Sequence, residues 1–268
     1  MKCCLLLVVL LLNLSLDSGC TKLGGLNRPA NGPDPQAGYV APEALPDSAV
    51  LLPPPPSAGS TAQSLDVEVN KRMLALRGTP RWNLAAEDAN TQFPEAAKIF
   101  SCALNAPISA KDAPHLYLLL QRTLADAGAS TDKAKIKYRR TRPFLVNNQS
   151  TCTPDLEKYM ISSGSYPSGH STAGWVWALI LSEIVPERTD AVLARGLAFG
   201  ESRLVCNAHW YSDVVAGRVM GAGTVARLHA DPVFRADLEA AKAEFAALSR
   251  RGLKPQRDCA AEAAALAQ

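Results

Sequence analysis

The stretch HSTAGWVWALILSEIV, residues 170–185, decides the fold, because it is apolar on nearly all sides and ends at Pro186. A helix that is hydrophobic all round is typical of the buried centre of a protein. A membrane span needs about 20 apolar residues, and no segment of this chain reaches that length without a charge. The stretch therefore predicts a buried central helix and no transmembrane segment.

Helical periodicity recurs on both sides of this stretch. Small residues such as Gly217 and Gly221 repeat along residues 212–228, which lets helices pack closely. No run of alternating β-branched residues is long enough to predict a sheet. We therefore expect an all-α fold, a single-domain helical bundle over residues 65–250. Its other helices are expected at residues 65–76, 87–100, 116–127, 191–201 and 212–228.

The segments outside the bundle differ from it in composition. Residues 21–64 are rich in proline, including a run at residues 53–56, and such a stretch favours extended polyproline conformations. We expect a proline-rich arm or linker that lies over the surface. The C-terminal tail, residues 251–268, is polar and then rich in alanine, which predicts one more helix.

The first 20 residues have the pattern of an export signal. Lys2 precedes an apolar run at residues 3–12, and the small residues Ser18 and Gly19 follow. This pattern predicts a periplasmic or secreted protein, and the alternative is a buried N-terminal helix. Cys20 resembles the lipid-anchored cysteine of a lipobox, although Asp17 occupies a position that is usually apolar. A lipid anchor at Cys20 and a free N-terminus are both open.

Composition narrows the class of protein further. Of the 268 residues, 47% are hydrophobic, which excludes a chain that is disordered throughout. The formal net charge of +3 is too small to predict a nucleic-acid partner. In an exported protein, the even number of cysteines beyond the leader predicts two disulfides, with three pairings open, or else buried free thiols. These cysteines are Cys102, Cys152, Cys206 and Cys259.

Three short segments carry the chemistry, and the first is KIKYRRTRP at residues 135–143. Pro143 moves Arg142 out of helical geometry to the end of an element. There its planar guanidinium can bind two phosphate oxygens. The alternative for a basic run is a solvated face. The basic residues of this run are Lys133, Lys135, Lys137, Arg139, Arg140 and Arg142.

The second segment, GSYPSGH at residues 164–170, leads into the central helix. Ser168 is a typical N-cap residue, and Gly169 lets the backbone come close to a ligand. The free N–H groups at a helix start form an anion site, where His170 can deliver a proton. The alternative for His170 is a capping or packing role.

The third segment is SRLVCNAHWYSD at residues 202–213. If it is helical, His209 and Asp213 lie one turn apart on one face. The carboxylate then fixes the tautomer that a nucleophilic histidine needs, and Arg203 is near enough to share the pocket. The alternative is a surface His–Asp pair.

Together the three segments contain the motifs K-x6-RP, PSGH and SR-x5-H-x3-D. In this the chain resembles the type 2 phosphatidic acid phosphatase superfamily over residues 65–235. The strings GSYPSGH and HWYSDV, with the exported format, resemble most the bacterial class A non-specific acid phosphatases. The motif positions are Lys135, Arg142, Pro143, Pro167, Ser168, Gly169, His170, Ser202, Arg203, His209 and Asp213.

The resemblance implies hydrolysis of small-molecule phosphate monoesters at acidic pH, without a metal or other cofactor. His209 is the implied nucleophile, which forms a phosphohistidine. His170 is the implied acid and base, and Asp213 orients His209. No Cys/His spacing or Asp-rich cluster suggests a metal site. The implied phosphate-binding residues are Lys135, Arg142, Ser168, Gly169 and Arg203.

The resemblance also implies a broad substrate range, phosphotransfer to alcohols as a side activity, and a homo-oligomer. A vanadium-dependent haloperoxidase and a non-catalytic phosphate-binding domain are the alternatives. The natural substrate and the balance between hydrolysis and transfer are not fixed by the sequence.

The expected phosphate pocket suggests one pairing of the cysteines. Cys152 lies in the loop before Pro167, and Cys206 lies between Arg203 and His209, so both should approach the pocket. A bridge between them leaves Cys102 and Cys259 to join the tail to the bundle.

Overall fold

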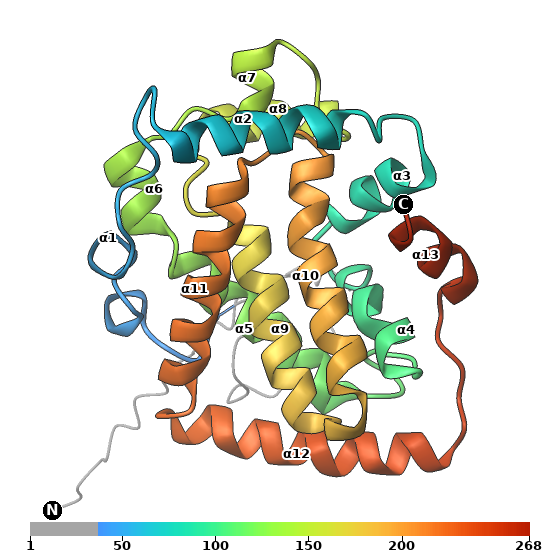
Figure 1. Cartoon of the computed structure of the whole chain (residues 1–268). Helices are drawn as coiled ribbons and strands as arrows, with labels where there is room; N and C mark the ends of the chain where they lie inside the picture. Colours follow the sequence, from blue (N-terminus) through green and yellow to red (C-terminus); the bar gives the residue numbers. More distant parts are fainter. Residues whose placement is uncertain (1–36) are drawn as a thin grey trace, which may run out of the picture. The chain divides into compact units, whose positions relative to one another are not determined.

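The computed structural model describes residues 37–268, which form helices and contain no β-strand. The central helix is α9 (Gly169–Ile184), and it packs between α10 (Thr189–Val205) and α11 (Tyr211–Leu228) (Figure 1). Helix α5 (Pro114–Ala129) also packs on α9, and α12 (Pro232–Arg250) contacts α5. The all-α fold expected from the sequence is confirmed.

The stretch at residues 170–185 is buried as predicted because its start is capped and its side chains fill the core. Ser168 is the N-cap, and its side chain accepts a hydrogen bond from Ser171 N–H. Trp177 is fully buried, and its Nε1–H donates to Leu120 O at 3.0 Å. A buried indole with its one donor satisfied adds a large apolar area to the core without a desolvation cost.

Glycines allow the three long helices to approach closely. A Cβ on Gly196 of α10 would lie 2.5 Å from Ala178 Cβ of α9, and one on Gly217 of α11 would lie 2.6 Å from Ser168 O. Any side chain at either position would push the helices apart. Gly217 therefore sets the distance between α11 and the start of α9.

The shorter helices surround this core. The predicted helix at residues 87–100 is wrong: α3 ends at Asp88, and a 3-10 helix follows only at Ala96–Phe100. The helix begins earlier because Thr79 caps it and Pro80 occupies its first position. The other helices are η1 (Pro42–Ala44), α1 (Ser48–Leu51), α2 (Thr61–Leu74), α3 (Pro80–Asp88), α4 (Ser101–Leu104), α6 (Asp132–Tyr138), α7 (Pro143–Asn147), η3 (Pro154–Leu156), α8 (Glu157–Ile161), η4 (Pro186–Arg188) and α13 (Cys259–Leu266).

The described part of the proline-rich segment takes part in the fold. Val40 and Leu45 are buried in the main core cluster. The expected boundary at residue 64 falls inside α2, which begins at Thr61. The export signal, Cys20 and the first part of the arm lie outside the described residues.

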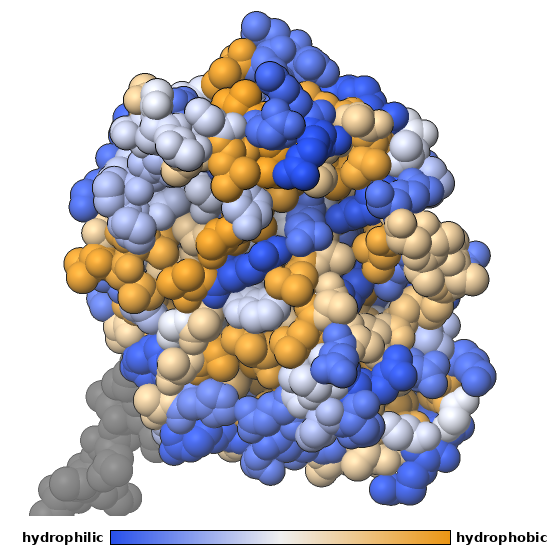
Figure 2. Space-filling view, viewed as in Figure 1, coloured by the Kyte–Doolittle hydropathy of each residue, from blue (hydrophilic) through white to orange (hydrophobic). Residues whose placement is uncertain are grey.

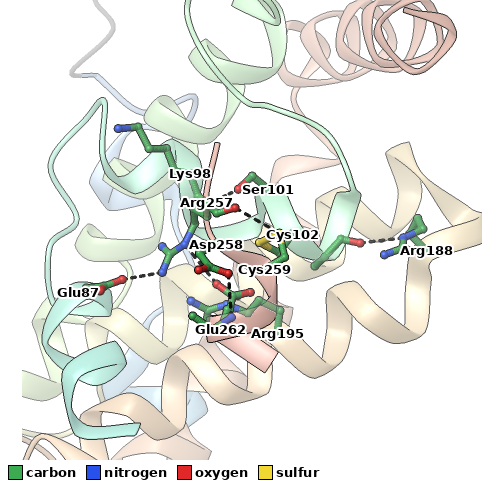
Figure 3. Close-up of a disulfide and its surroundings, with 12 residues drawn as sticks. Glu87, Lys98, Ser101, Cys102, Arg188, Arg195, Arg257, Asp258, Cys259 and Glu262 are labelled. Atoms are coloured by element: carbon green, nitrogen blue, oxygen red, sulfur yellow. Dashed lines mark hydrogen bonds and ion pairs between the residues drawn. A yellow bond between two sulfur atoms is a disulfide. The ribbon is translucent and has the colours of Figure 1, made fainter. Parts of the chain in front are cut away.

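The C-terminal tail contains the predicted helix, α13. Its first residue, Cys259, forms a disulfide with Cys102 (Figure 3). In residues 37–268, no helix combines the length and the apolar character that crossing a membrane requires.

Candidate active site

The fold brings the three sequence segments together at one end of α9, α10 and α11. Lys135 comes from α6 and Arg142 is the N-cap of α7. His170 stands in the first turn of α9, Arg203 lies near the end of α10, and His209 follows α10. Positive charges on Arg142, Lys135 and Arg203 all lower the pKa of His209, so these groups lie within electrostatic reach of one another.

His209 and Asp213 meet, but not through the continuous helix that the sequence analysis assumed. Helix α10 ends at Val205 because Asn207 takes a left-handed conformation, with φ of 60°. Helix α11 begins only at Tyr211. Asp213 caps that helix start: its Oδ2 accepts from Trp210 N–H at 2.8 Å and lies 3.3 Å from His209 Nδ1.

The contacts of His209 fix its tautomer. Arg142 Nη1 lies 3.0 Å from His209 Nε2. Arginine has no acceptor, so Nε2 must accept, and the ring proton lies on Nδ1 facing Asp213. Burial, followed by the charge of Arg142, holds the pKa of His209 well below 6.5, so the ring is neutral.

His170 has the opposite tautomer. Its Nε2 lies 3.1 Å from Ala89 O, and a carbonyl oxygen only accepts, so Nε2 carries the proton and Nδ1 the lone pair. The ring stacks on Phe199, with centroids 6.1 Å apart. Burial and the charge of Arg203 lower its pKa to about 3.

Arg203 is a buried cation with free donors. Its residue is 2% exposed, and among residues 37–268 its Nε and Nη1 have no hydrogen-bond partner. Only Nη2 has a neighbour, Met160 Sδ at 3.9 Å. A buried donor without a partner costs about 1–3 kcal/mol, and a charged one more. An anion beside Arg203 would remove this cost.

Lys135 and Ser168 also form hydrogen bonds within the protein, and the bond of Ser168 is the N-cap of α9. Lys135 Nζ donates to Pro167 O at 2.6 Å and Gly164 O at 3.2 Å, and therefore holds the loop before α9. Burial and the charge of Arg142 lower the pKa of Lys135 to about 7. Gly169, the first residue of α9, contributes its N–H at the positive end of the helix dipole.

A cavity of ≈ 410 Å³ adjoins the cations. Its lining combines basic with apolar side chains, and Leu145 and Ile161 of the rim are exposed. Figure 2 shows hydrophobic residues near the top of the view, where α2 crosses in front of α8 and α7 rises above it in Figure 1. Across the described range 37–268, no group of three or more His, Cys, Asp or Glu residues is arranged to hold a metal ion.

Both disulfides have the pairing that the sequence analysis suggested. Cys152 is joined to Cys206, next to the site, and Cys102 to Cys259. Cys152 N–H also donates to Cys206 O at 3.2 Å. The first bridge therefore fixes the segment between α7 and η3 to the turn that carries His209.

Sequence reasoning missed the roles of two charged residues. Arg140 donates to Asp213 Oδ1 at 2.6 Å and to Asp66 Oδ2 at 2.7 Å. Arg140 lies in the basic run, but nothing in that run sets it apart from its neighbours. Asp66 is one of two acidic residues on α2, and no sequence signal indicates its partner.

Comparisons with known proteins identify the family of this chain. Residues 116–235 match the PAP2 superfamily. The chain is 44% identical to the non-specific acid phosphatase of Providencia stuartii, over 76% of this chain and 83% of the relative. It is 43% identical to the non-specific acid phosphatase of Salmonella typhimurium, over 77% and 83%. It is 40% identical to the acid phosphatase of Zymomonas mobilis, over 74% and 75%. The chain therefore belongs to the class A bacterial acid phosphatases of the PAP2 superfamily.

Proposed function

We propose that this enzyme hydrolyses phosphate monoesters without a metal, through a phosphohistidine at His209. One observation carries the proposal: within residues 37–268 the buried guanidinium of Arg203 has donors without a partner, next to His209, whose unprotonated Nε2 faces the guanidinium of Arg142. A phosphoryl group has charge on three non-bridging oxygens, and its transfer depends mainly on positioning and charge stabilisation. Arg203, Arg142, Lys135 and the Gly169 N–H supply donors for those oxygens.

In the first step, His209 Nε2 attacks phosphorus. The P–N bond forms while the P–O bond to the leaving group breaks, and a proton that the substrate monoanion brings passes through His170 Nδ1 to the leaving oxygen. Asp213 stabilises the positive charge that develops on the His209 ring. The products are the free alcohol and a phosphohistidine, with His170 neutral.

In the second step, water attacks phosphorus and gives a proton to His170 Nδ1. The P–N bond breaks, and its electron pair returns to His209 Nε2. Inorganic phosphate leaves with the proton from His170, and both histidines are neutral again, as in the free protein. An alcohol in place of this water yields a new phosphate ester, which is the proposed phosphotransferase side activity.

The substitution His209→Ala tests the nucleophile. We expect it to abolish the phosphoenzyme trapped by acid quench from a radiolabelled monoester, and to lower kcat by about 10³-fold or more. His115→Ala, which changes an exposed histidine, should leave both unchanged, and a chelator should not reduce wild-type turnover. Normal turnover of His209→Ala, or loss of wild-type activity with the chelator, would contradict the proposal.

Export of this enzyme to the periplasm or medium is proposed from its first 20 residues, with Cys20 as a lipid-anchor candidate. A homo-oligomer is proposed from the family alone. Mass spectrometry of the mature N-terminus distinguishes a diacylglyceryl-modified Cys20 from an unmodified terminus. Light scattering of the purified enzyme measures its oligomeric state.

A further inference from the structure

A chain of charged side chains continues from Asp213, on the side away from His209. Arg140 joins Asp213 to Asp66 through two nitrogens, at 2.6 and 2.7 Å. Asp66 also accepts from Ser212, through its backbone N–H at 2.8 Å and its Oγ at 2.7 Å. The side chains of Arg140, Asp66 and Asp213 are 11%, 1% and 0% exposed. Neither Arg140 nor Asp66 belongs to the three motifs.

We propose that Arg140 and Asp66 are positioning residues, which hold Asp213 ionised in one orientation and thereby set the tautomer of His209. Their catalytic importance rests on the phosphohistidine mechanism proposed above. Their effect on the tautomer does not rest on that mechanism, because His209 has its tautomer before any substrate binds.

The two oxygens of Asp213 have separate tasks. Oδ2 faces Trp210 N–H and His209 Nδ1, whereas Oδ1 faces Arg140. Burial raises the pKa of Asp213, and Arg140 opposes this rise. Without Arg140 the carboxyl would be protonated more easily, and a protonated carboxyl could donate to His209 Nδ1. This shifts the ring proton toward Nε2, where only the donor Arg142 opposes it, and a ring with its proton on Nε2 cannot attack phosphorus.

Asp66 fixes the guanidinium itself. Its carboxylate holds the second nitrogen of Arg140, and the Trp210 ring lies with its centroid 5.6 Å from Arg140 Cζ. A planar guanidinium that binds two carboxylates has little freedom to rotate. Helix α2, which supplies none of the motif residues, thus becomes part of the support for His209.

The test compares Arg140→Met, Arg140→Lys and Asp66→Asn with two controls on the exposed face of α2, Arg72→Met and Glu68→Gln. Long-range ¹H–¹⁵N NMR of the substrate-free protein reports the tautomer of His209. We expect its Nδ1–H form to be lost in Arg140→Met and weakened in Asp66→Asn. Arg140→Lys, which keeps a charge near Asp213, should restore part of it, and both controls should keep it.

Kinetics provide the second measurement. Arg140→Met should lower kcat by about 100-fold, less than the ~10⁴-fold that a wrong tautomer costs in a serine protease. KM should change less than about threefold, since an effect on kcat alone indicates loss of transition-state stabilisation. In the Asp213→Asn background, removal of Arg140 should cost little more, because coupled residues are not additive.

Three results would overturn the proposal: an unchanged tautomer in Arg140→Met, a fall in thermal stability with normal kcat, or additive effects with Asp213→Asn. If Arg140→Met does not fold, the near-isosteric Asp66→Asn decides by the same two measurements. A tautomer shift in a protein that forms no phosphoenzyme would refute the proposed function and leave the positioning role intact.

Discussion

At the scale of residues, the two histidines of the site are prepared for different tasks by single contacts. His209 accepts from Arg142 at Nε2, and His170 donates from Nε2 to Ala89 O. The nitrogen without a proton is therefore Nε2 in His209 and Nδ1 in His170. The low pKa of His170, about 3, means that it is neutral in the free protein at mildly acidic pH.

The pH dependence of the reaction follows from this neutral His170. The proton for the leaving group must then enter with the substrate, whose phosphate has a second pKa near ~6. We expect kcat/KM to fall as pH rises through the second pKa of the substrate, because the dianion brings no proton. Monoesters with different phosphate pKa values should show correspondingly shifted alkaline limbs. An alkaline limb at one pH for every substrate would instead assign this ionisation to the enzyme.

At the scale of elements, the end of α3 supports two parts of the site. Asp88, its last residue, accepts from Ser202 Oγ at 2.6 Å and pairs with Arg195 of α10. The next carbonyl, Ala89 O, holds His170. Figure 3 shows Glu262 of α13 beside Arg195, with Nε and Oε1 3.5 Å apart. The tail therefore packs against this support, and among the described residues the hydrogen bonds of His170 and His209 go to other parts of the chain.

The two disulfides should consequently have different effects. The double substitution Cys102→Ser with Cys259→Ser should cost about 2–5 kcal/mol of unfolding free energy, with kcat/KM unchanged well below the melting temperature. Replacing Cys152 and Cys206 by serine should lower both the unfolding free energy and kcat/KM, because that bridge supports the turn before His209. Denaturant unfolding and steady-state kinetics measure the two quantities. Equal kinetic losses in both double variants would contradict the distinction.

At the scale of the whole molecule, the site has a cost in stability at acidic pH. The unfolded chain protonates His170 near its ordinary pKa of 6.5, whereas the folded protein does so only near about 3. Between these values the unfolded state binds more protons, so stability falls as pH falls. The buried positive charges of Arg203, Arg142 and Lys135 lower the pKa of His170 further and so increase this loss of stability. A bound phosphate anion offsets these charges.

Thermal and denaturant unfolding can measure this cost. From pH 7 to pH 4.5 we expect wild type to lose about 2–3 kcal/mol more than His170→Asn, at 1.36 kcal/mol for each unit of pKa shift. Inorganic phosphate should reduce the difference, because its charge favours a protonated His170. Parallel loss of stability in both proteins, with or without phosphate, would show that His170 titrates normally.

The sequence by itself determined the features that depend on local pattern. The apolar stretch at residues 170–185 predicted the central helix, because a segment without a polar face can only be buried. Ser168 predicts the helix start, and the three motifs contain Lys135, Arg142, His170, Arg203 and His209. Residues 87–100 were misassigned because the cap at Thr79 and the break before Pro94 outweighed the apolar periodicity.

Only the tertiary structure decided how these groups act on one another. The tautomers of His209 and His170 depend on Arg142 and on Ala89 O, which are 67 and 81 positions away in the chain. Asp66 reaches Arg140 across 74 positions. Periodicity and caps report only neighbours within a turn or two of helix. Partners brought together by packing leave no local signature, because any buried carboxylate at the right place in space would serve.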